Sequence, residues 1–251
     1  VSQKQLSALV DGALKAELRT ECRADGAHLA HLSLVALPGA GAWLTAHTAE
    51  DGRAIECDLF RVALKRRIRA KVMPCDGFCP CCGDIMDCFR DHALVCRCKG
   101  YRTVRHNQIR NMIFEEALRA GAGAEKEKPG LLPPRPTADG IQVGQGARRP
   151  ADVWLPRSQG GTGEALDLTC TSGMRADILD KTRQDGGVVF PLYEELKRSY
   201  EDTDRLCREA GFKFTPLIFE AHGGGWSGST RKVVGRGANR LLAWWGKNQP
   251  L

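Results

Sequence analysis

The stretch "RRPADVWLPRSQGGTGEALDLTCTS", residues 148–172, places two aspartates in two apolar, β-prone segments. Asp152 lies in "ADVWL" and Asp167 in "ALDLTCT", and the turn-rich segment between them predicts a hairpin loop. An ionised carboxylate in an apolar strand is costly unless something compensates its charge. Two such carboxylates on adjacent strands can hold a divalent cation against a phosphate oxygen. The stretch therefore predicts a metal-dependent site that cleaves phosphodiesters.

The segments around this hairpin alternate between helix and strand signals, which predicts an α/β (α+β) domain with a small mixed sheet flanked by helices. Helices are expected over residues 2–20, 58–71, 104–120, 191–210 and 229–247. Strands are expected at 125–128, around each of the two aspartates, and in "FKFTPLIFEAH" at 212–222. Residues 32–46, "LSLVALPGAGAWLTA", favour a short strand, a turn and an extended piece. We expect three parts: a helical and extended region at 1–72, a zinc knuckle at 73–103, and the α/β domain at 104–251.

The 251 residues, 42% of them hydrophobic, suffice for one substantial core and a smaller module. The chain has no run of 18 apolar residues, so we expect no membrane partner. It begins at Val1 rather than methionine, which suggests a fragment of a longer polypeptide or a processed product.

The positive charge is concentrated in one region, which points to a polyanionic partner such as nucleic acid. Residues 61–110 contain twelve Lys and Arg against four Asp and Glu, whereas the whole chain carries a net charge of +7. The simplest alternative is a solvated basic face. The candidate nucleic-acid-binding residues are Lys65, Arg66, Arg67, Arg69, Arg102, Arg105 and Arg110.

The eleven cysteines are an odd number, and seven of them fall between Cys75 and Cys98. This clustering favours metal binding over a disulfide framework. The spacings Cys79-x2-Cys82 and His92-x3-Cys96 are those of a structural zinc site with four protein ligands. Gly83 permits the tight turn after the first pair. Cys81 is an alternative ligand to either neighbour, and free or redox-active cysteines are the alternative to zinc.

Two further positions bear on the aspartate site. Glu116 shares a helical face with the apolar residues Ile109, Met112 and Ile113. It would either complete the metal site or pair with an arginine at the edge of the apolar stripe. His106 is expected near the start of this helix, as a phosphate contact or as part of an N-terminal cap.

The order "RRPAD…ALDLT" resembles the PD-(D/E)XK nuclease core. The Cys-Cys-His-Cys pattern that precedes it makes the resemblance more specific. Together they are similar to the restriction-like endonuclease at the C-terminus of R2-type non-LTR retrotransposon proteins. "CPCCG…FRDHALVC", "RHNQIRN", "EKPGLLPP", "RRPADVWLP" and "EAHGGGW" also look like segments of such regions, and the likeness covers roughly residues 37–226. The resemblance implies that Asp152 and Asp167 bind catalytic Mg²⁺ or Mn²⁺, with Glu116 as the acid of the helix.

One position departs from that family. Thr169 stands where the nuclease core has its lysine, two residues after the second acid. Threonine carries no charge, so Lys197 or Lys181 from the following helices would have to supply it. Lys197 is preferred because it lies on the face of its helix that carries Tyr193 and Tyr200. If neither lysine reaches the site, the domain binds DNA without cutting it.

The sequence thus predicts an endonuclease region that nicks double-stranded DNA in the nucleus, with structural zinc and catalytic Mg²⁺ or Mn²⁺. The resemblance implies that the nick primes reverse transcription by an upstream reverse transcriptase domain and that the RNA of the element is a further partner. The alternative is a catalytically inactive, zinc-containing nucleic-acid-binding module on the same fold. A third possibility is an interaction domain in which zinc serves only to hold the chain together.

Overall fold

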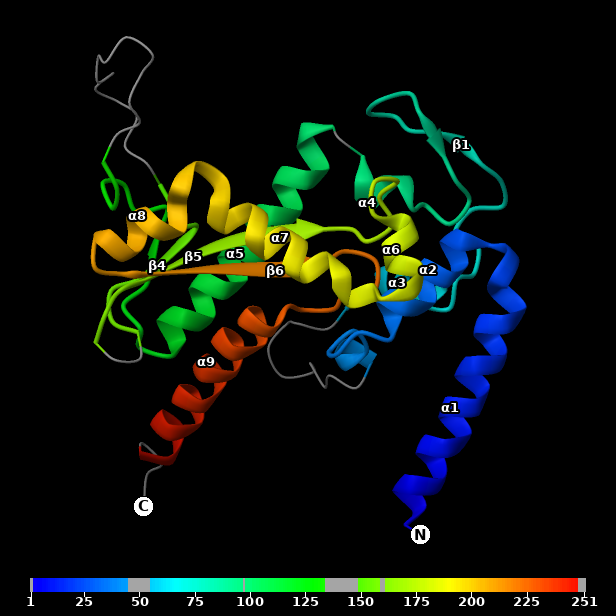
Figure 1. The fold of residues 1–251 in the computed structure, drawn as a ribbon, viewed down its shortest axis with the longest axis horizontal. Coiled ribbons are helices and arrows are strands. Elements are labelled where there is room, and N and C mark those ends of the chain that lie inside the picture. Colours follow the sequence, from blue (N-terminus) through cyan, green and yellow to red (C-terminus); the bar gives the residue numbers. More distant parts are fainter. Residues whose placement is uncertain (1, 45–54, 97, 134–148, 159–160, 248–251) are drawn as a thin grey trace. The chain divides into compact units, whose positions relative to one another are not determined.

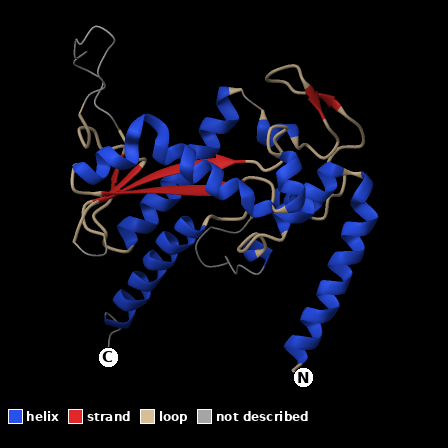
Figure 2. Cartoon of the chain, in the orientation of Figure 1, coloured by secondary structure: helices blue, strands red, loops and turns tan. Residues whose placement is uncertain are grey.

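The computed structural model describes residues 2–44, 55–96, 98–133, 149–158 and 161–247. These residues form a mixed α/β (α+β) structure with a four-stranded sheet, a separate two-stranded hairpin and several helices (Figures 1 and 2). The strands are β1 (Gly77–Phe78), β2 (Ile85–Met86), β3 (Glu125–Lys126), β4 (Val153–Leu155), β5 (Glu164–Thr171) and β6 (Lys213–Glu220). The fold class expected from the sequence is thereby confirmed at the level of a small sheet combined with helices.

The contacts of the chain divide it into two units. The first contains residues 1–96, 171–189 and 220–225, and the second contains residues 97–170, 190–219 and 226–251. The units are interleaved along the sequence. The segments that follow β5 and β6 belong to the first unit, whereas both strands lie in the second unit except for their last residues. The division into parts at 1–72, 73–103 and 104–251 stays a prediction.

The second unit contains the four-stranded sheet in the order β3-β4-β5-β6. β3, β4 and β5 are antiparallel neighbours, and Val153 of β4 is opposite Leu166 of β5. The predicted hairpin between the two aspartates is therefore confirmed. Backbone hydrogen bonds join Lys213 N to Gly163 O and Ala221 N to Thr171 O, in the same order along both strands. β6 thus runs parallel to β5, which makes the sheet mixed.

Helices pack on both faces of this sheet (Figure 1). They are α5 (Lys99–Arg119), α7 (Val189–Ser199), α8 (Thr203–Glu209) and α9 (Gly228–Lys247). One face of the sheet packs against α5 and α9 through Val153, Leu155, Leu166, Leu168 and Leu217, with Ile109, Ile113 and Val233 on the helices. The other face packs against α8 through Trp154, Ala165, Phe214 and Cys207. Because side chains alternate along a strand, Asp167 shares the face of Ala165 and not that of Leu166.

The predicted single helix over 191–210 is two helices. α7 ends at Ser199, a short 3-10 turn η4 (Tyr200–Asp202) follows, and α8 begins at Thr203. Glu201 and Asp202 both have positive φ, at 48° and 56°. Two successive left-handed residues cannot continue an α-helix, so they separate α7 from α8.

The first unit consists of the N-terminal helices, the β1–β2 hairpin and the segment after β5. Its helices are α1 (Gln3–Glu21), α2 (Gly26–Val35), α3 (Cys57–Arg67), α4 (His92–Val95) and α6 (Leu179–Gln184), with 3-10 turns η1 (Cys22–Ala24), η2 (Ala42–Leu44) and η3 (Gly186–Val188). The side chain of Ser2 accepts a hydrogen bond from Gln5 N in a capping box that begins α1. The predicted helix over 2–20 is thereby confirmed.

The strand predicted at the start of residues 32–46 is wrong, because these residues continue α2 up to Val35. Asp25 begins the helix by accepting a hydrogen bond from His28 N, and Leu34 is fully buried. Glycines allow other segments to approach the last turn of α2. A Cβ at Gly223 would lie 2.3 Å from Leu34 O, and one at Gly186 would lie 2.5 Å from Ser33 O. Such distances leave room for glycine only.

Within the described residues, no helix combines the length and the apolar character that a membrane crossing requires.

Candidate metal centre and active site

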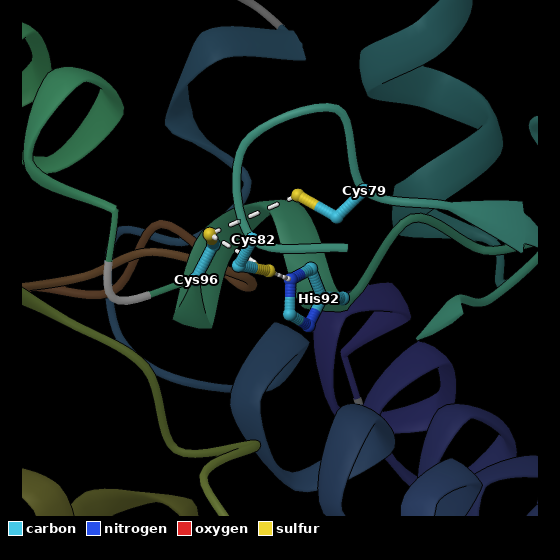
Figure 3. Close-up of side chains that lie close together, drawn as sticks. All are labelled: Cys79, Cys82, His92 and Cys96. Carbon is cyan, nitrogen blue, oxygen red and sulfur yellow. Dashed lines mark hydrogen bonds between the residues drawn. The ribbon is translucent and has the colours of Figure 1, made fainter. Parts of the chain in front are cut away.

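Four side chains of the first unit form a group that could hold a metal ion (Figure 3). They are Cys79, Cys82, His92 and Cys96, and their ligand atoms all lie within 4.8 Å of one another. The Sγ atom of Cys96 lies 3.8 Å from that of Cys79 and 3.7 Å from that of Cys82. The Nε2 atom of His92 lies 3.1 Å from Cys82 Sγ. The structure brings together the four residues that the spacing singled out.

Local backbone geometry positions each half of this group. Cys79 and Cys82 lie in the turn between β1 and β2, where Gly83 has a φ of 77° and its N–H donates to Cys79 O. Only glycine adopts this conformation readily. The second half is carried by α4, where Cys96 N donates to His92 O, one turn earlier. Asp87 fixes the start of this turn by accepting hydrogen bonds from Asp91 N and His92 N, both at 3.0 Å.

The site favours the thiolate form of at least one cysteine. Cys79 is buried, yet hydrogen bonds from the backbone amides of Cys81 and Cys82 lower the pKa of its thiol to about 6. A thiolate is the form of cysteine that binds metal. Cys81, the alternative ligand left open by the sequence, is exposed and is not a member of the four-residue group.

The two aspartates of the hairpin belong to the second unit and are neighbours there. Asp152 lies directly before β4, and its Oδ2 accepts a hydrogen bond of 2.6 Å from Leu168 N on β5. Asp167 lies on β5, close enough for the Asp152 carboxylate to act on its pKa. The antiparallel pairing of β4 with β5 thus brings together two carboxylates that are fifteen positions apart in the sequence.

The two carboxyl groups have opposite pKa shifts. Partial burial and the Asp152 carboxylate raise the pKa of Asp167 to about 6, although Lys197 acts against this rise. Burial alone would also raise the pKa of Asp152, but hydrogen bonds from His106 and Leu168 N hold it below its ordinary value. A pair of acids whose surroundings separate their pKa values is typical of sites that do acid–base or metal chemistry.

A lysine from α7 reaches this pair. The Nζ atom of Lys197 lies 2.9 Å from Oδ2 and 3.2 Å from Oδ1 of Asp167. The sequence left Lys197 and Lys181 open as sources of positive charge, and the structure brings Lys197 to Asp167. Lys181 is an exposed residue of α6. Thr169, at the position of the family's lysine, is partly buried on β5.

The α5 residue that contacts the pair is His106, whose role the sequence analysis missed. Its Nε2 atom lies 3.0 Å from Oδ1 of Asp152, which raises the pKa of the imidazole. α5 begins at Lys99, so His106 lies within the helix and the N-terminal cap expected for it is wrong. Its contact with a phosphate stays a prediction. The signal available in the sequence was its spacing: His106 precedes Ile109 and Ile113 of the buried stripe by three and seven residues.

Glu116, the acid proposed for α5, lies 2.7 Å from Arg119 Nη1, and its side chain is 42% exposed. This ion pair is the alternative that the sequence left open. Among the described residues, one set of three or more potential ligands has all its ligand atoms within 4.8 Å of one another, namely Cys79, Cys82, His92 and Cys96 (the Cys79 group). Glu116 therefore does not form such a set with Asp152 and Asp167.

Three arginines of α3 and the following turn do not form the exposed basic surface that the sequence predicts. Arg66 donates to the carbonyls of Phe89 and Arg90, and Arg67 donates to that of Ala40. The guanidinium of Arg69 lies 2.6 Å from Asp91, and its side chain is 7% exposed. These three arginines point into the first unit, where they satisfy backbone carbonyls and a carboxylate instead of forming a solvated stripe. Lys65 is exposed.

The basic residues of α5 differ among themselves. Arg110 pairs with Glu127 and is 15% exposed, and Arg105 is partly buried. Arg102 is exposed and precedes His106 by one helical turn, so it lies on the same side of α5. Arg102 is therefore the member of this group that can contact a large ligand beside the aspartates.

No protein-family model matches the chain, and a search of curated proteins finds none that matches it.

Proposed function

We propose that the chain is a metal-dependent DNA endonuclease region of a retrotransposon-derived polyprotein, similar to the R2-type restriction-like endonuclease. One observation carries the proposal: adjacent strands and two helices bring two acids, a lysine and a histidine together around a single point. These residues are Asp152, Asp167, Lys197 and His106. The order of a Cys-Cys-His-Cys group followed by this pair supports the same reading.

The aspartate pair suits Mg²⁺ or Mn²⁺, because carboxylate oxygens are the ligands that these ions prefer. Asp152 and Asp167 would hold the ion. When bound, it would supply a nucleophilic water at neutral pH and neutralise charge on the phosphate.

The residues of the chain have separate tasks in this proposal. Lys197 would supply the positive charge that Thr169 cannot, since its ammonium lies 2.9 Å from Oδ2 of Asp167. A fixed cation at this place stabilises negative charge as it develops on the phosphate oxygens. His106 orients Asp152 by its hydrogen bond, together with Leu168 N on the other carboxylate oxygen. Arg102 contacts a flanking phosphate of the same strand.

We propose structural zinc for the Cys79 group. A tetrahedral zinc ion with Zn–S bonds of about 2.3 Å separates two sulfurs by roughly 3.8 Å. The two Sγ–Sγ distances to Cys96, 3.8 and 3.7 Å, agree with that separation. Four protein ligands leave no coordination position for a substrate, so the zinc would be structural and not catalytic.

In the context of a retroelement, the nick in double-stranded DNA would leave a 3′ end that primes reverse transcription by an upstream domain. Element RNA would then be a second nucleic-acid partner, and the nucleus the place of action. The exposed basic residues Lys65 and Arg102 are available for such contacts.

Incubation with supercoiled plasmid, followed by analysis of the DNA ends, tests this function. The proposal predicts open-circular product with Mn²⁺ or Mg²⁺ and none with EDTA, and a 3′-hydroxyl at the nick that a polymerase extends. Nicks that a polymerase cannot extend would contradict the priming role, and equal product with EDTA would contradict the metal-dependent chemistry.

The second candidate is a zinc-containing nucleic-acid-binding module that no longer cuts. Thr169 at the lysine position favours it, since the family's charge is missing from β5. DNA binding without product in either metal would support this candidate.

A further inference from the structure

A cavity of about 330 Å³ opens beside Asp167 in the second unit. Asp167 and Lys197 lie in its wall, next to Tyr200 and Arg149. Phe214 and Leu132 contribute buried apolar surface. Its volume lies within the range of roughly 300–1,000 Å³ that is usual for small-molecule sites. It is too large to be a packing defect in a well-filled core.

The walls of this cavity combine three kinds of surface. Tyr200 is an aromatic residue that is 57% exposed, and Leu196 in the same wall is 56% exposed. Arg149 brings a guanidinium whose side chain is 59% exposed, and its partner Glu127 is 3.3 Å away at the surface. An aromatic ring, apolar walls and an exposed cation fit a nucleobase with an adjoining phosphate.

The backbone at this wall is held in an unusual conformation. Glu201 and Asp202, directly after Tyr200, both adopt left-handed φ and ψ values. Such residues cost free energy and tend to lie at functional sites. Here the break separates α7 from α8 and turns the chain where Tyr200 faces the cavity. Arg198 and Asp204, 2.9 Å apart, form an ion pair across the break.

We infer that this cavity accepts one unstacked nucleotide next to the phosphate that a cation at Asp152 and Asp167 would hold, with its base on Tyr200 and its outer phosphate at Arg149. A base within a continuous duplex is stacked and paired, so it enters such a cavity only after it leaves the helix. The substrate is therefore DNA that is unpaired, or becomes unpaired, beside the scissile phosphate. The inference rests on the proposed function for its substrate, but the cavity binds its nucleotide whether or not cleavage follows.

Photo-cross-linking tests the inference directly. The probe is a single-stranded thymidine oligonucleotide with one 5-iodouracil, which cross-links to an aromatic ring in contact with it. Trypsin would release Tyr200 in the peptide Ser199–Arg205, where it is the sole aromatic residue. We expect the adduct on this peptide, and less of it when the same strand is fully paired in a duplex.

Variants of the full chain supply the controls. Tyr200→Ala should remove the adduct and weaken binding of the oligonucleotide by a factor of roughly 5 to 150, the effect of about 1–3 kcal/mol for one base–aromatic stack. Tyr200→Phe should retain both. Tyr101→Ala, at a tyrosine that is 50% exposed on α5 and outside the cavity, should leave the adduct unchanged.

The outcomes separate this inference from the proposed function. Asp167→Asn should abolish nicking and keep the adduct on Ser199–Arg205. If the wild-type chain does not nick but forms the adduct, the endonuclease proposal fails and the nucleotide site stands. Adducts confined to other peptides, or unchanged affinity of Tyr200→Ala, would overturn the inference.

Discussion

The Nζ atom of Lys197 on α7 lies 2.9 Å from Oδ2 of Asp167 on β5. The two residues are thirty positions apart in the sequence. In the proposed function, Lys197 would replace the lysine of the nuclease core, at whose position β5 has Thr169. The positive charge that the nuclease core carries on its strand would here come from a helix.

Replacement of Lys197 tests this arrangement. We expect Lys197→Ala to lower the nicking rate by roughly 10²- to 10³-fold, the usual effect of losing one fixed group that stabilises charge in the transition state. Lys181→Ala, at the other candidate lysine, should stay within about twofold of wild type. The rates would be measured on supercoiled plasmid at saturating Mn²⁺. Full activity of Lys197→Ala, or loss of activity in Lys181→Ala, would contradict the assignment of this positive charge to Lys197.

Metal binding should depend on pH because the pKa of Asp167 is raised to about 6. The carboxyl group is neutral below that pH and ionised above it, and a cation requires the ionised form. Calorimetric titration with Mn²⁺ should therefore give an affinity that rises between about pH 5 and pH 7, with proton release that disappears above this window. Asp167→Asn should bind weakly at every pH. Wild-type affinity that is constant from pH 5 to pH 7 would refute the assignment.

The Cys79 group should bind one zinc ion per chain, and its removal should unfold the first unit. We expect Cys79→Ser or His92→Ala to lose the metal and the cooperative unfolding transition of this unit, because structural zinc contributes folding free energy. Cys75→Ser is the matched control, since Cys75 is exposed and outside the group. Metal analysis and thermal denaturation measure both effects. Stoichiometric zinc in Cys79→Ser would show that another cysteine is the ligand.

Glu164, at the start of β5, should be a main determinant of the stability of the second unit. Its fully buried carboxylate accepts from Thr215 Oγ1 at 2.6 Å and pairs with Lys213 and Arg236, both at 3.1 Å. Removal of one partner from a buried ion pair costs roughly 3–5 kcal/mol. We expect Glu164→Ala to lose about 3 kcal/mol in urea denaturation at pH 7, the low end because Lys213 is largely exposed. Glu125→Ala, at a half-exposed surface pair, should lose less than about 0.5 kcal/mol.

The pH dependence of the free energy of unfolding gives a second test of the role of Glu164. Burial would raise the pKa of its carboxyl group, but hydrogen bonds from Ser158, Thr215, Arg236 and Lys213 lower it to about 2. A folded-state pKa below the unfolded value of about 4.3 contributes stability that is present above that value and lost as the pH falls toward 2. The stability difference between wild type and Glu164→Ala should therefore shrink between pH 5 and pH 2. A constant difference over this range would count against the network.

Features set by local spacing were predictable from the sequence. The ligand group needs only a turn at Gly83 and one helical turn from His92 to Cys96, and both follow from neighbouring residues. The aspartate pair needs only a hairpin between Asp152 and Asp167, and the turn-rich segment between them predicts one.

Features that depend on distant partners were not predictable. The short apolar run at 32–35 is compatible with a buried strand or a buried helix, and packing of glycines from distant segments on α2 decides for the helix. Arg69 belongs to a basic cluster in the sequence, but it is buried because Asp91 lies 2.6 Å away in the fold. His106 likewise gains its role only when α5 packs beside the strand of Asp152.

The measurement that tests the endonuclease account most directly is the nicking of supercoiled plasmid by wild type, Asp152→Ala and Asp167→Ala, with and without Mn²⁺. Asp180→Ala is the matched control, because this aspartate on α6 has an 85% exposed side chain. The account predicts Mn²⁺-dependent nicking by wild type and by Asp180→Ala, and its loss in both hairpin variants while DNA binding remains. Wild-type nicking by either hairpin variant would contradict it.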